Sequence, residues 1–490
     1  MSSLPNNSTN VSTLEENHPN THLAHQLHLQ GVSLYNQLGQ GNPQAAVQAI
    51  ELLEKSVSIV ETPESLVHLA KLHMVIGSNQ KAIDCAHQCL VKFFPVENLR
   101  NVLVETLFLK QDFARNIYRQ AQRILGQAYA QLAQYENAIV HLRVVHTVSQ
   151  FEKEFLTNSH LPSSHSQNPS RDDMDNEFDL AYALLALQRY EEGWHHYRVR
   201  YQPGFDAKLD MTKAKIPVPL WDGNLNSLKG STVILLPEQG YGDQIQFARC
   251  AKFLREAGAN VWILSSPVSF DLMQNLPWQD RVVGEDFRQF EAVHFWSTVL
   301  HISAMLAMNP YSNPIACPYL FANSVQKEKF AKLLSDNEQK SASAKEIIAI
   351  NWRGNSKHIN DKYRSMTLQE MLAEVRRHID IFSTQHPDSS KKIRLVSIQI
   401  SPSEAELEVM HAKGIKNLAS DIRNLSDMAG ALANVDQLLT IDSAPAHLAG
   451  ALNLPTTLLI PPRIDWRWGC HAEAPPWYRS IKLRPQLRFT

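Results

Sequence analysis

The most constraining stretch of this chain is residues 231–249, which read STVILLPEQGYGDQIQFAR. Residues 232–236 have strong strand character, and a turn rich in Pro and Gly follows them. Beyond the turn, the apolar residues between 245 and 253 recur at the spacing of an amphipathic helix. A strand, a tight loop and a helix in this order predict an α/β sheet, in which ligands bind at the carboxyl ends of the strands.

Asp243 lies where the loop enters the helix, and two non-catalytic interpretations compete for this stretch. Gly240 and Gly242 resemble the start of a dinucleotide-binding fingerprint, but its third glycine would fall at position 245, which is Ile245. Alternatively, Asp243 caps the helix, because Asp is among the best N-cap residues and favours the positive helix end. The loop alone supports capping and chemistry equally.

The overall composition excludes several classes of partner. The chain has 47 Lys and Arg against 49 Asp and Glu, so its formal charge of -2 creates no strong field for nucleic acid or anionic lipid. Its five cysteines show neither zinc-type spacing nor the density of a disulfide framework. No segment approaches the roughly 20 apolar residues of a membrane helix. We therefore expect a cytoplasmic protein with no nucleic-acid partner and no integral membrane segment.

Residues 21–203 have a helical pattern with an imperfect repeat, after a stretch 1–20 that we expect to be disordered. The unit around Gly126 matches the spacing of a tetratricopeptide hairpin, and similar units surround Ala70 and Ala181. These centres are 56 and 55 residues apart, against about 34 in that repeat, so we expect extra helix over 96–117 and a solvated loop over 158–176. Such helices present a concave face to a peptide or partner, or act as a plain scaffold.

The rest of the chain alternates strands with helices, as parallel sheets require. Residues 204–325 contain expected strands at 232–236, 261–264, 281–283 and 292–294. Residues 326–490 contain expected strands at 347–351, 394–399, 437–441 and 456–460. We therefore expect two α/β domains after the helices.

Five motifs in the α/β part carry a specific resemblance. They are PEQGYGDQIQFAR, IAINWRGNSKHINDKYRS (348–365), VSIQ (396–399), IDSAPAHLAGAL (441–452) and DWRWG (465–469). From Trp221 onward the chain resembles the glycosyltransferase region of bacterial tetratricopeptide-repeat proteins, which is similar to the ADP-heptose heptosyltransferases of glycosyltransferase family 9. The resemblance implies the GT-B fold, with an acceptor domain (204–325) and a nucleotide-sugar donor domain (326–490), both Rossmann-like, facing each other across the active-site cleft.

The motif at 441–452 leads from a strand into a helix that begins near Ser443, a credible N-cap. The amides of a first helical turn form an anion site suited to a diphosphate, and the resemblance places the sugar nucleotide here. An ordinary capped helix is the simpler alternative. The predicted donor-binding residues are Asn355, Lys357, Lys362, Arg364, Gln399, Asp442, Ser443, Ala444, Pro445, Ala446 and His447.

The loop after Trp352 is rich in cationic groups, which can offset diphosphate charge without a metal, although such a run is often a solvated loop. With no Asp-x-Asp motif in either domain, we expect metal-independent transfer that needs no cofactor beyond the nucleotide-sugar co-substrate. Asp243 would remove the proton of the acceptor hydroxyl, and configuration would invert. The predicted acceptor-binding residues are Glu238, Gln239, Gly240, Gly242 and Gln244; Trp466, Arg467, Trp468 and Trp477 line the cleft or pack beneath it.

Three functions remain open. The first is a glycosyltransferase of the heptosyltransferase-like type, in which the repeats select a protein or glycan acceptor. The second is a protein O-glycosyltransferase that resembles the O-linked N-acetylglucosamine transferases. The third is a non-catalytic adaptor that retains a degenerate GT-B domain.

Overall fold

The computed structural model describes residues 19–37, 43–94, 112–158, 170–205, 216–335, 345–358, 360–385, 392–470 and 474–489. The chain forms two compact units, residues 1–180 and 181–490. Residues 1–18 of the stretch expected to be disordered, and most of both expected insertions, lie outside the described residues, whereas residues 19 and 20 begin a helix and are not disordered. Where they are described, residues 112–117 and 171–176 form the first turns of helices, so the loop expected over 158–176 is wrong for its last residues.

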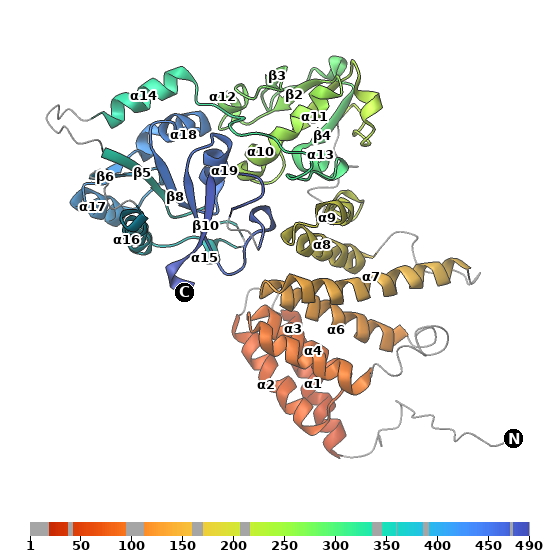
Figure 1. The fold of residues 1–490 in the computed structure, drawn as a ribbon. Helices are drawn as coiled ribbons and strands as arrows, with labels where there is room; N and C mark the ends of the chain where they lie inside the picture. Colours follow the sequence, from red (N-terminus) through yellow and green to blue (C-terminus); the bar gives the residue numbers. More distant parts are fainter. Residues whose placement is uncertain are drawn as a thin grey trace. The chain divides into compact units, whose positions relative to one another are not determined.

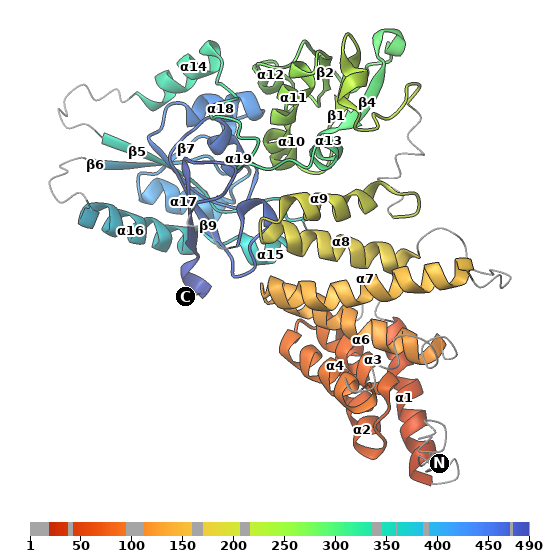
Figure 2. The same cartoon turned by 45° about the vertical axis from the view of Figure 1, so that its right-hand side comes forward.

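The first unit consists of α-helices that pack as successive antiparallel pairs (Figure 1). The helices are α1 (Pro19–Gln37), α2 (Pro43–Ile59), α3 (Pro63–Val75), α4 (Asn79–Phe93), α6 (Asp112–Gln131), α7 (Tyr135–Asn158) and the first part of α8 (Arg171–Ala186). Figure 2 shows the same pairs from a second direction. The helical hairpins expected from the sequence are confirmed, whereas their identity as tetratricopeptide repeats stays a prediction.

Small residues set the spacing of these pairs, as the repeat pattern predicts. A β-carbon at Gly126 would lie 2.5 Å from Leu142 Cγ, so only glycine allows α6 and α7 to approach this closely. The start of α3 is set by Thr62, whose Oγ1 accepts a 3.2 Å hydrogen bond from the Ser65 amide, followed by Pro63 in the first turn. Local sequence therefore fixes both the helix ends and the pairing.

The second unit begins with the end of α8, followed by α9 (Tyr190–Tyr197) and the 3-10 helix η2 (Arg198–Tyr201). Trp194 on α9 is fully buried, and its Nε1 donates a 2.7 Å hydrogen bond to the Met308 carbonyl. Its ring also packs edge-on against Phe247 and Trp466. The last helical segment is thus built into the core of the α/β unit.

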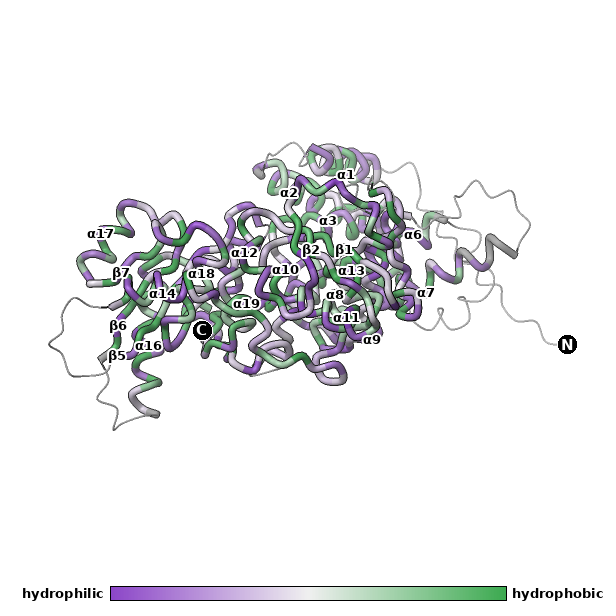
Figure 3. Tube along the Cα trace, turned by 90° about the horizontal axis from the view of Figure 1, so that it is seen from above, coloured by the Kyte–Doolittle hydropathy of each residue, from purple (hydrophilic) through white to green (hydrophobic). Residues whose placement is uncertain are grey.

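A four-stranded parallel sheet forms the first half of this unit, in the order β3-β2-β1-β4. Its strands are β1 (Thr232–Leu236), β2 (Asn260–Leu264), β3 (Arg281–Val283) and β4 (Phe295–Thr298). The helices around it are α10 (Tyr241–Phe247), α11 (Ala251–Glu256), α12 (Phe270–Met273) and α13 (Val299–Met305). Apolar segments, green in Figure 3, coincide with strands such as β1, in which Val233, Ile234 and Leu235 are buried.

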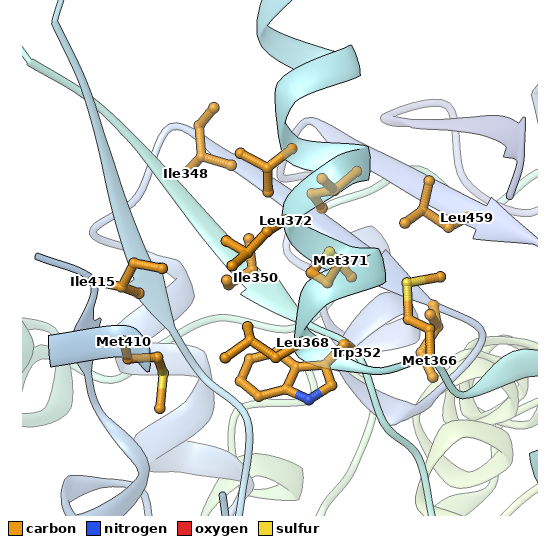
Figure 4. Close-up of a cluster of buried hydrophobic side chains, with 13 residues drawn as sticks. Ile348, Ile350, Trp352, Met366, Leu368, Met371, Leu372, Met410, Ile415 and Leu459 are labelled. Carbon is orange, nitrogen blue, oxygen red and sulfur yellow. The ribbon is translucent and has the colours of Figure 1, made fainter. Parts of the chain in front are cut away.

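A six-stranded parallel sheet forms the second half, in the order β10-β9-β8-β5-β6-β7. Its strands are β5 (Lys345–Asn351), β6 (Lys392–Ser397), β7 (Lys416–Asn417), β8 (Gln437–Ile441), β9 (Thr456–Ile460) and β10 (Ile481–Pro485). Its helices are α14 (Ser324–Leu334), α15 (Asp361–Arg364), α16 (Leu368–Gln385), α17 (Glu404–Ala412), α18 (Leu425–Leu432) and α19 (Ala444–Ala451). Figure 4 shows α16 lying on this sheet, with Leu368, Met371 and Leu372 packed on Ile348 and Ile350. None of the described helices has both the length and the apolar composition needed to cross a bilayer.

The expectation of two parallel sheets is confirmed, with one strand misplaced and two missed. The strand expected at 292–294 is wrong, because residues 290–292 form a 3-10 turn and the strand runs from Phe295 to Thr298. This strand pairs with β1 from Phe295 to Thr298. On its other side, the Trp296 amide donates to the Pro219 carbonyl, and the Trp296 carbonyl accepts from the Trp221 amide. β7 and β10 were not predicted, since one is two residues long and the other is a half-exposed edge strand.

Arg249, just beyond α10, ties the two halves together. Its fully buried guanidinium donates to the Gln246 carbonyl at 2.7 Å, to the Trp477 carbonyl at 3.0 Å and to the Tyr319 hydroxyl at 3.0 Å. Tyr319 belongs to the segment between the sheets, and its amide donates to the Ala451 carbonyl at the end of α19. Both sheets therefore share one buried polar junction.

Candidate active site

A cavity of about 1170 Å³ opens at the carboxyl ends of strands from both sheets. In the six-stranded sheet the order of the strands reverses between β5 and β8, and the loops after both strands line the cavity. In the four-stranded sheet the reversal of strand order falls between β1 and β4, and the loop after β1 lines the same cavity. Ligands of open α/β sheets bind at such points, so two binding edges face one space.

Asp243 is the third residue of α10 and lines this cavity. Its Oδ2 accepts a 3.3 Å hydrogen bond from the Gly240 amide, so it caps the helix from inside the first turn and is not the N-cap residue. Its Oδ1 lies 2.5 Å from Arg467 Nη2. Burial raises the pKa of Asp243, and the charge of Arg467 opposes the rise. A capping role and a chemical role therefore coexist in one side chain.

Arg467 holds the charges of the cavity wall together. It pairs with Asp465 at 2.9 Å as well as with Asp243, and its Nη2 donates to Gln239 Oε1 at 3.1 Å. Burial acts against the ionisation of Asp465, but Arg467 outweighs it and holds the pKa of Asp465 below its ordinary value. Burial, and then the charge of Asp465, raise the pKa of Asp442 to about 6. On this wall the pKa of Asp442 is therefore raised, whereas the pKa of Asp465 is lowered.

His447 lines the cavity without carrying charge. Burial lowers the pKa of its imidazole to about 3, so the ring is neutral near pH 7. The ring stacks on Trp468 with centroids 4.4 Å apart, and Nδ1 lies 3.3 Å from the Tyr478 hydroxyl. A β-carbon at Gly242 would approach His447 Cδ2 to 2.7 Å, which explains the glycine at that position.

The cationic loop after β5 divides into lining and exposed residues. Arg353 and Arg364 line the cavity, whereas Lys357 and Lys362 are exposed and do not contribute to its wall. Arg353 Nη1 pairs with Glu406 Oε1 at 2.9 Å. Arg364 is fixed by a 3.0 Å hydrogen bond to the Asp442 carbonyl and an ion pair with Asp361 at 3.3 Å.

Gln399 and Asn355, both predicted for the donor site, also line the cavity. Gln399 Oε1 accepts hydrogen bonds from the amides of Trp352 at 3.1 Å and Arg353 at 2.8 Å, so this side chain anchors the start of the cationic loop. Asn355 Oδ1 accepts a 3.0 Å hydrogen bond from the Lys357 amide and shapes the loop further along.

The start of α19 differs in detail from the expectation. Ser443 stands at the N-cap position but makes no capping bond, because its hydroxyl donates to Asn351 Oδ1 at 3.0 Å. The Ala446 amide donates to the Ser443 carbonyl at 2.9 Å, and Pro445 has no N–H, so this turn offers an anion fewer amides than the sequence suggests. Ala444 and Pro445 line the cavity with Ser443, whereas Ala446 is fully buried.

On the other wall, Gln239, Gly240, Gly242 and Gln244 line the cavity, as the acceptor-site prediction requires. Glu238 does not contribute to the wall. Its buried carboxylate accepts hydrogen bonds from Arg200 at 3.1 Å, from the Tyr201 hydroxyl at 3.2 Å, and from Thr298. Burial raises the pKa of Glu238, and Arg200 opposes this.

Several lining residues escaped the sequence analysis. Of the four residues of the carboxyl-terminal aromatic motifs, Arg467 lines the cavity, while Trp466, Trp468 and Trp477 are buried beneath it. Arg353 and His358, which belong to the cationic loop predicted to offset the diphosphate charge, also line the cavity. Lining residues that were not proposed include Asn351, Arg423, Arg463, Asp465 and Tyr182. Asp465 had a signal, since it lies two residues from Arg467 in the DWRWG string. Among the described residues, no cluster of three or more His, Cys, Asp or Glu is arranged to hold a metal ion.

Comparisons with known proteins give distant similarities. No family model matches the chain. FlbA of Caulobacter vibrioides is 26% identical over 327 residues, covering 62% of this chain and 51% of FlbA, so the chain spans about half the length of this curated relative. The ADP-heptose heptosyltransferase II structure from E. coli aligns at 12% identity and a TM-score of 0.35, over 52% of this chain and 90% of its own. An O-GlcNAc transferase mutant from Thermobaculum terrenum aligns at 11% identity and a TM-score of 0.28, over 90% of this chain and 83% of its own. Because TM-scores this low do not establish a shared fold, the chain's own residues must carry any assignment.

Proposed function

We propose that residues 181–490 transfer a sugar from a nucleotide-sugar donor to a hydroxyl acceptor, by metal-independent displacement with inversion. One observation carries the proposal: a largely buried carboxylate held by the four-stranded sheet and fixed arginines held by the six-stranded sheet line the same cavity. The order of motifs along the chain, which resembles that of GT-B glycosyltransferases, supports the same reaction. The chemistry needs a base on one side of the anomeric carbon and cationic groups on the other.

The arginines after β5 suit the leaving group. Arg364 is held in place by Asp361 and by the Asp442 carbonyl, so its guanidinium is preorganised for an anionic ligand. Guanidinium groups bind phosphate oxygens through charge-assisted, often bidentate hydrogen bonds. We assign the diphosphate to Arg364, Arg353 and the start of α19, a smaller set than the sequence predicts because Lys357 and Lys362 lie off the wall.

Asp243 is suited to act as the general base. As the acceptor oxygen bonds to the anomeric carbon, its proton passes to the Asp243 carboxylate, and the bond to the diphosphate breaks with its electron pair on the departing oxygen. Burial, which raises the pKa of Asp243, increases its strength as a base. Proton removal by a positioned base contributes about 10² to 10⁴ in rate.

A protein acceptor, as in O-linked N-acetylglucosamine transfer, is the second candidate, and the helical hairpins of the first unit in the same chain favour it. The third candidate is an adaptor that binds without catalysis. The Asp243–Arg467 ion pair favours this one, because an arginine contact stabilises the carboxylate and weakens it as a base.

Thermal-shift screening of the full chain with ADP-, UDP-, GDP- and dTDP-sugars separates these candidates. A ligand at 100 times its Kd stabilises the folded state by about 2.7 kcal/mol, which is readily measured. Each donor that shifts melting is then offered with glycan and peptide acceptors, using Asp243→Asn as the inactive reference. Binding without transfer to either acceptor class favours the adaptor, and absence of any shift refutes the nucleotide-sugar site.

A further inference from the structure

Gln239 has an unusual backbone at the edge of the candidate active site. Its φ of 59° lies in the left-handed region, which residues other than glycine rarely adopt. Such conformations persist only where surrounding contacts impose them, and they gather at functional sites. The residue lies between β1 and α10 and lines the cavity.

The side-chain amide of Gln239 supplies those contacts. Its Nε2 donates a 3.2 Å hydrogen bond to the Tyr197 hydroxyl, and its Oε1 accepts a 3.1 Å hydrogen bond from Arg467 Nη2. The same Nη2 lies 2.5 Å from Asp243 Oδ1. Gln239 therefore orients the nitrogen that pairs with the candidate base.

Tyr197 is itself rigidly held by α9. The side chain is buried and packs edge-on against Trp194, with ring centroids 5.2 Å apart. The following residue, Arg198, donates from Nε to the Ala304 carbonyl at 3.2 Å, which anchors the end of this helix on α13. The position of the Tyr197 hydroxyl is therefore set by the packing of α9 and not by the cavity.

We propose that Gln239 and Tyr197 are positioning residues, through which the last helical segment, α9, sets the place of Arg467 against Asp243. The inference deepens the proposed function and rests on it for the role of Asp243. It assigns to α9 a part in catalysis that differs from acceptor selection. Neither residue takes a proton or contacts the anomeric carbon in this arrangement.

The titratable groups near Asp243 determine how its pKa would change if Arg467 were held less firmly. Arg467 and Asp465 face it from the segment after β9, and they act in opposite directions on its pKa. From α9, Tyr197 is neutral because burial raises its pKa well above the ordinary value. From α19, His447 is neutral near pH 7 because burial lowers its pKa to about 3. If Arg467 is held less firmly, its charge no longer opposes the effect of burial, and the pKa of Asp243 rises.

The test compares Tyr197→Phe and Gln239→Ala with Tyr311→Phe in the full chain. Tyr311 is an exposed tyrosine of the same unit whose hydroxyl donates to Gln188, so its substitution is a matched loss of one hydroxyl away from the cavity. We expect Tyr197→Phe to lower kcat about 10- to 100-fold with the donor KM unchanged, because Asp243 is then held less precisely against the acceptor and this loss exceeds the gain in its basicity. The acidic limb of the pH–rate profile should move upward with the pKa of Asp243. Tyr311→Phe leaves both unchanged.

A double-mutant cycle on unfolding free energy tests the contact without any assay of transfer. The effects of Tyr197→Phe and Gln239→Ala should be non-additive, because each removes the same hydrogen bond. Additive effects overturn the inference whether or not the protein is an enzyme. Coupled stabilities in an active enzyme with an unmoved pH profile also overturn it, since the contact would then be structural only. Absence of transfer by the wild type refutes the proposed function, and with it the catalytic role inferred for α9.

Discussion

Replacing Asp243 with Asn removes the charge of the candidate base and keeps its shape. The Asn oxygen still accepts the hydrogen bond from the Gly240 amide, which retains the cap within the first turn of α10. Arg467 loses one partner but keeps Asp465 at 2.9 Å. The substitution therefore isolates the ionisation of Asp243 from its packing.

The sign of the stability change follows from the pKa. Burial raises the pKa of Asp243 in the folded state despite the opposing charge of Arg467. An acid with a raised folded pKa contributes stability that is fully present below the unfolded pKa, about 3.9, and is lost as pH rises through the folded pKa. At pH 7 the wild type has lost that contribution, so Asp243→Asn should be at least as stable as the wild type. The advantage of the variant should shrink as the pH falls toward the unfolded pKa.

A view based on the ion pair alone predicts the opposite. Removing one partner of a buried pair usually costs about 3–5 kcal/mol, because the other charge is left uncompensated. Urea unfolding between pH 4 and pH 8 distinguishes the two views. Asp222→Asn is the matched control, since Asp222 is exposed and its Oδ1 likewise accepts a backbone hydrogen bond, from Asn224 at 2.9 Å. A loss near 3 kcal/mol at pH 7 would falsify the reasoning from burial.

The same variant separates the base from the cap in a transfer assay. A general base is worth about 10² to 10⁴ in rate, so Asp243→Asn should lose at least about a hundredfold in turnover while donor affinity persists. Near-normal turnover in the Asn variant would leave Asp243 with the cap alone.

Three further predictions follow from the cavity wall and the core. Gly242→Ala should destabilise the fold by about 1–3 kcal/mol, because its β-carbon would lie 2.7 Å from the packed His447 ring, whereas Gly240→Ala, whose nearest contact is at 3.8 Å, should be close to neutral in urea unfolding. Ala444→Glu should weaken nucleotide binding at least about tenfold relative to Ala444→Gln in calorimetry, because it adds a negative charge to the cavity wall. The expected loss is that of one charge-assisted hydrogen bond, about 1.5–3 kcal/mol. Ala446, predicted for this role from the sequence, is fully buried, so a charge there would test folding instead. A fragment that begins at residue 216 lacks Trp194, which is fully buried, and should fail to fold. A fragment that begins at residue 171 should melt cooperatively. Equal melting of the two fragments would contradict the assignment of α9 to the second unit.

Local sequence was enough to place most of the strands and the loops that follow them. β1, β3, β8 and β9 lie where apolar runs end at turn residues, and the loops after β1, β5 and β8 do line one cavity. β4 was misplaced because its extent is defined by pairing with β1 on one side and with residues 219–221 on the other. That pairing lies outside any local window.

The partners within the site could not be read from the sequence. Asp243 and Arg467 are 224 residues apart, and only the folded chain brings them within 2.5 Å. Glu238 lies beside residues that do line the cavity, yet its carboxylate is held by Arg200 and Thr298. The left-handed backbone at Gln239 has no signal in its residue type, since glutamine seldom adopts it.

The buried guanidinium of Arg249 has a consequence for how this part of the chain loses its structure. Its N–H groups donate to Gln246, Tyr319 and Trp477, which belong to both halves of the unit. If either sheet melted, the guanidinium would lose some of these hydrogen-bond partners while it stayed buried in the other half. A charge without partners in a dry interior is costly, and this cost makes an intermediate with one sheet intact unfavourable. Residues 181–490 should then melt as a single cooperative block, in which neither sheet persists as an independent foldon.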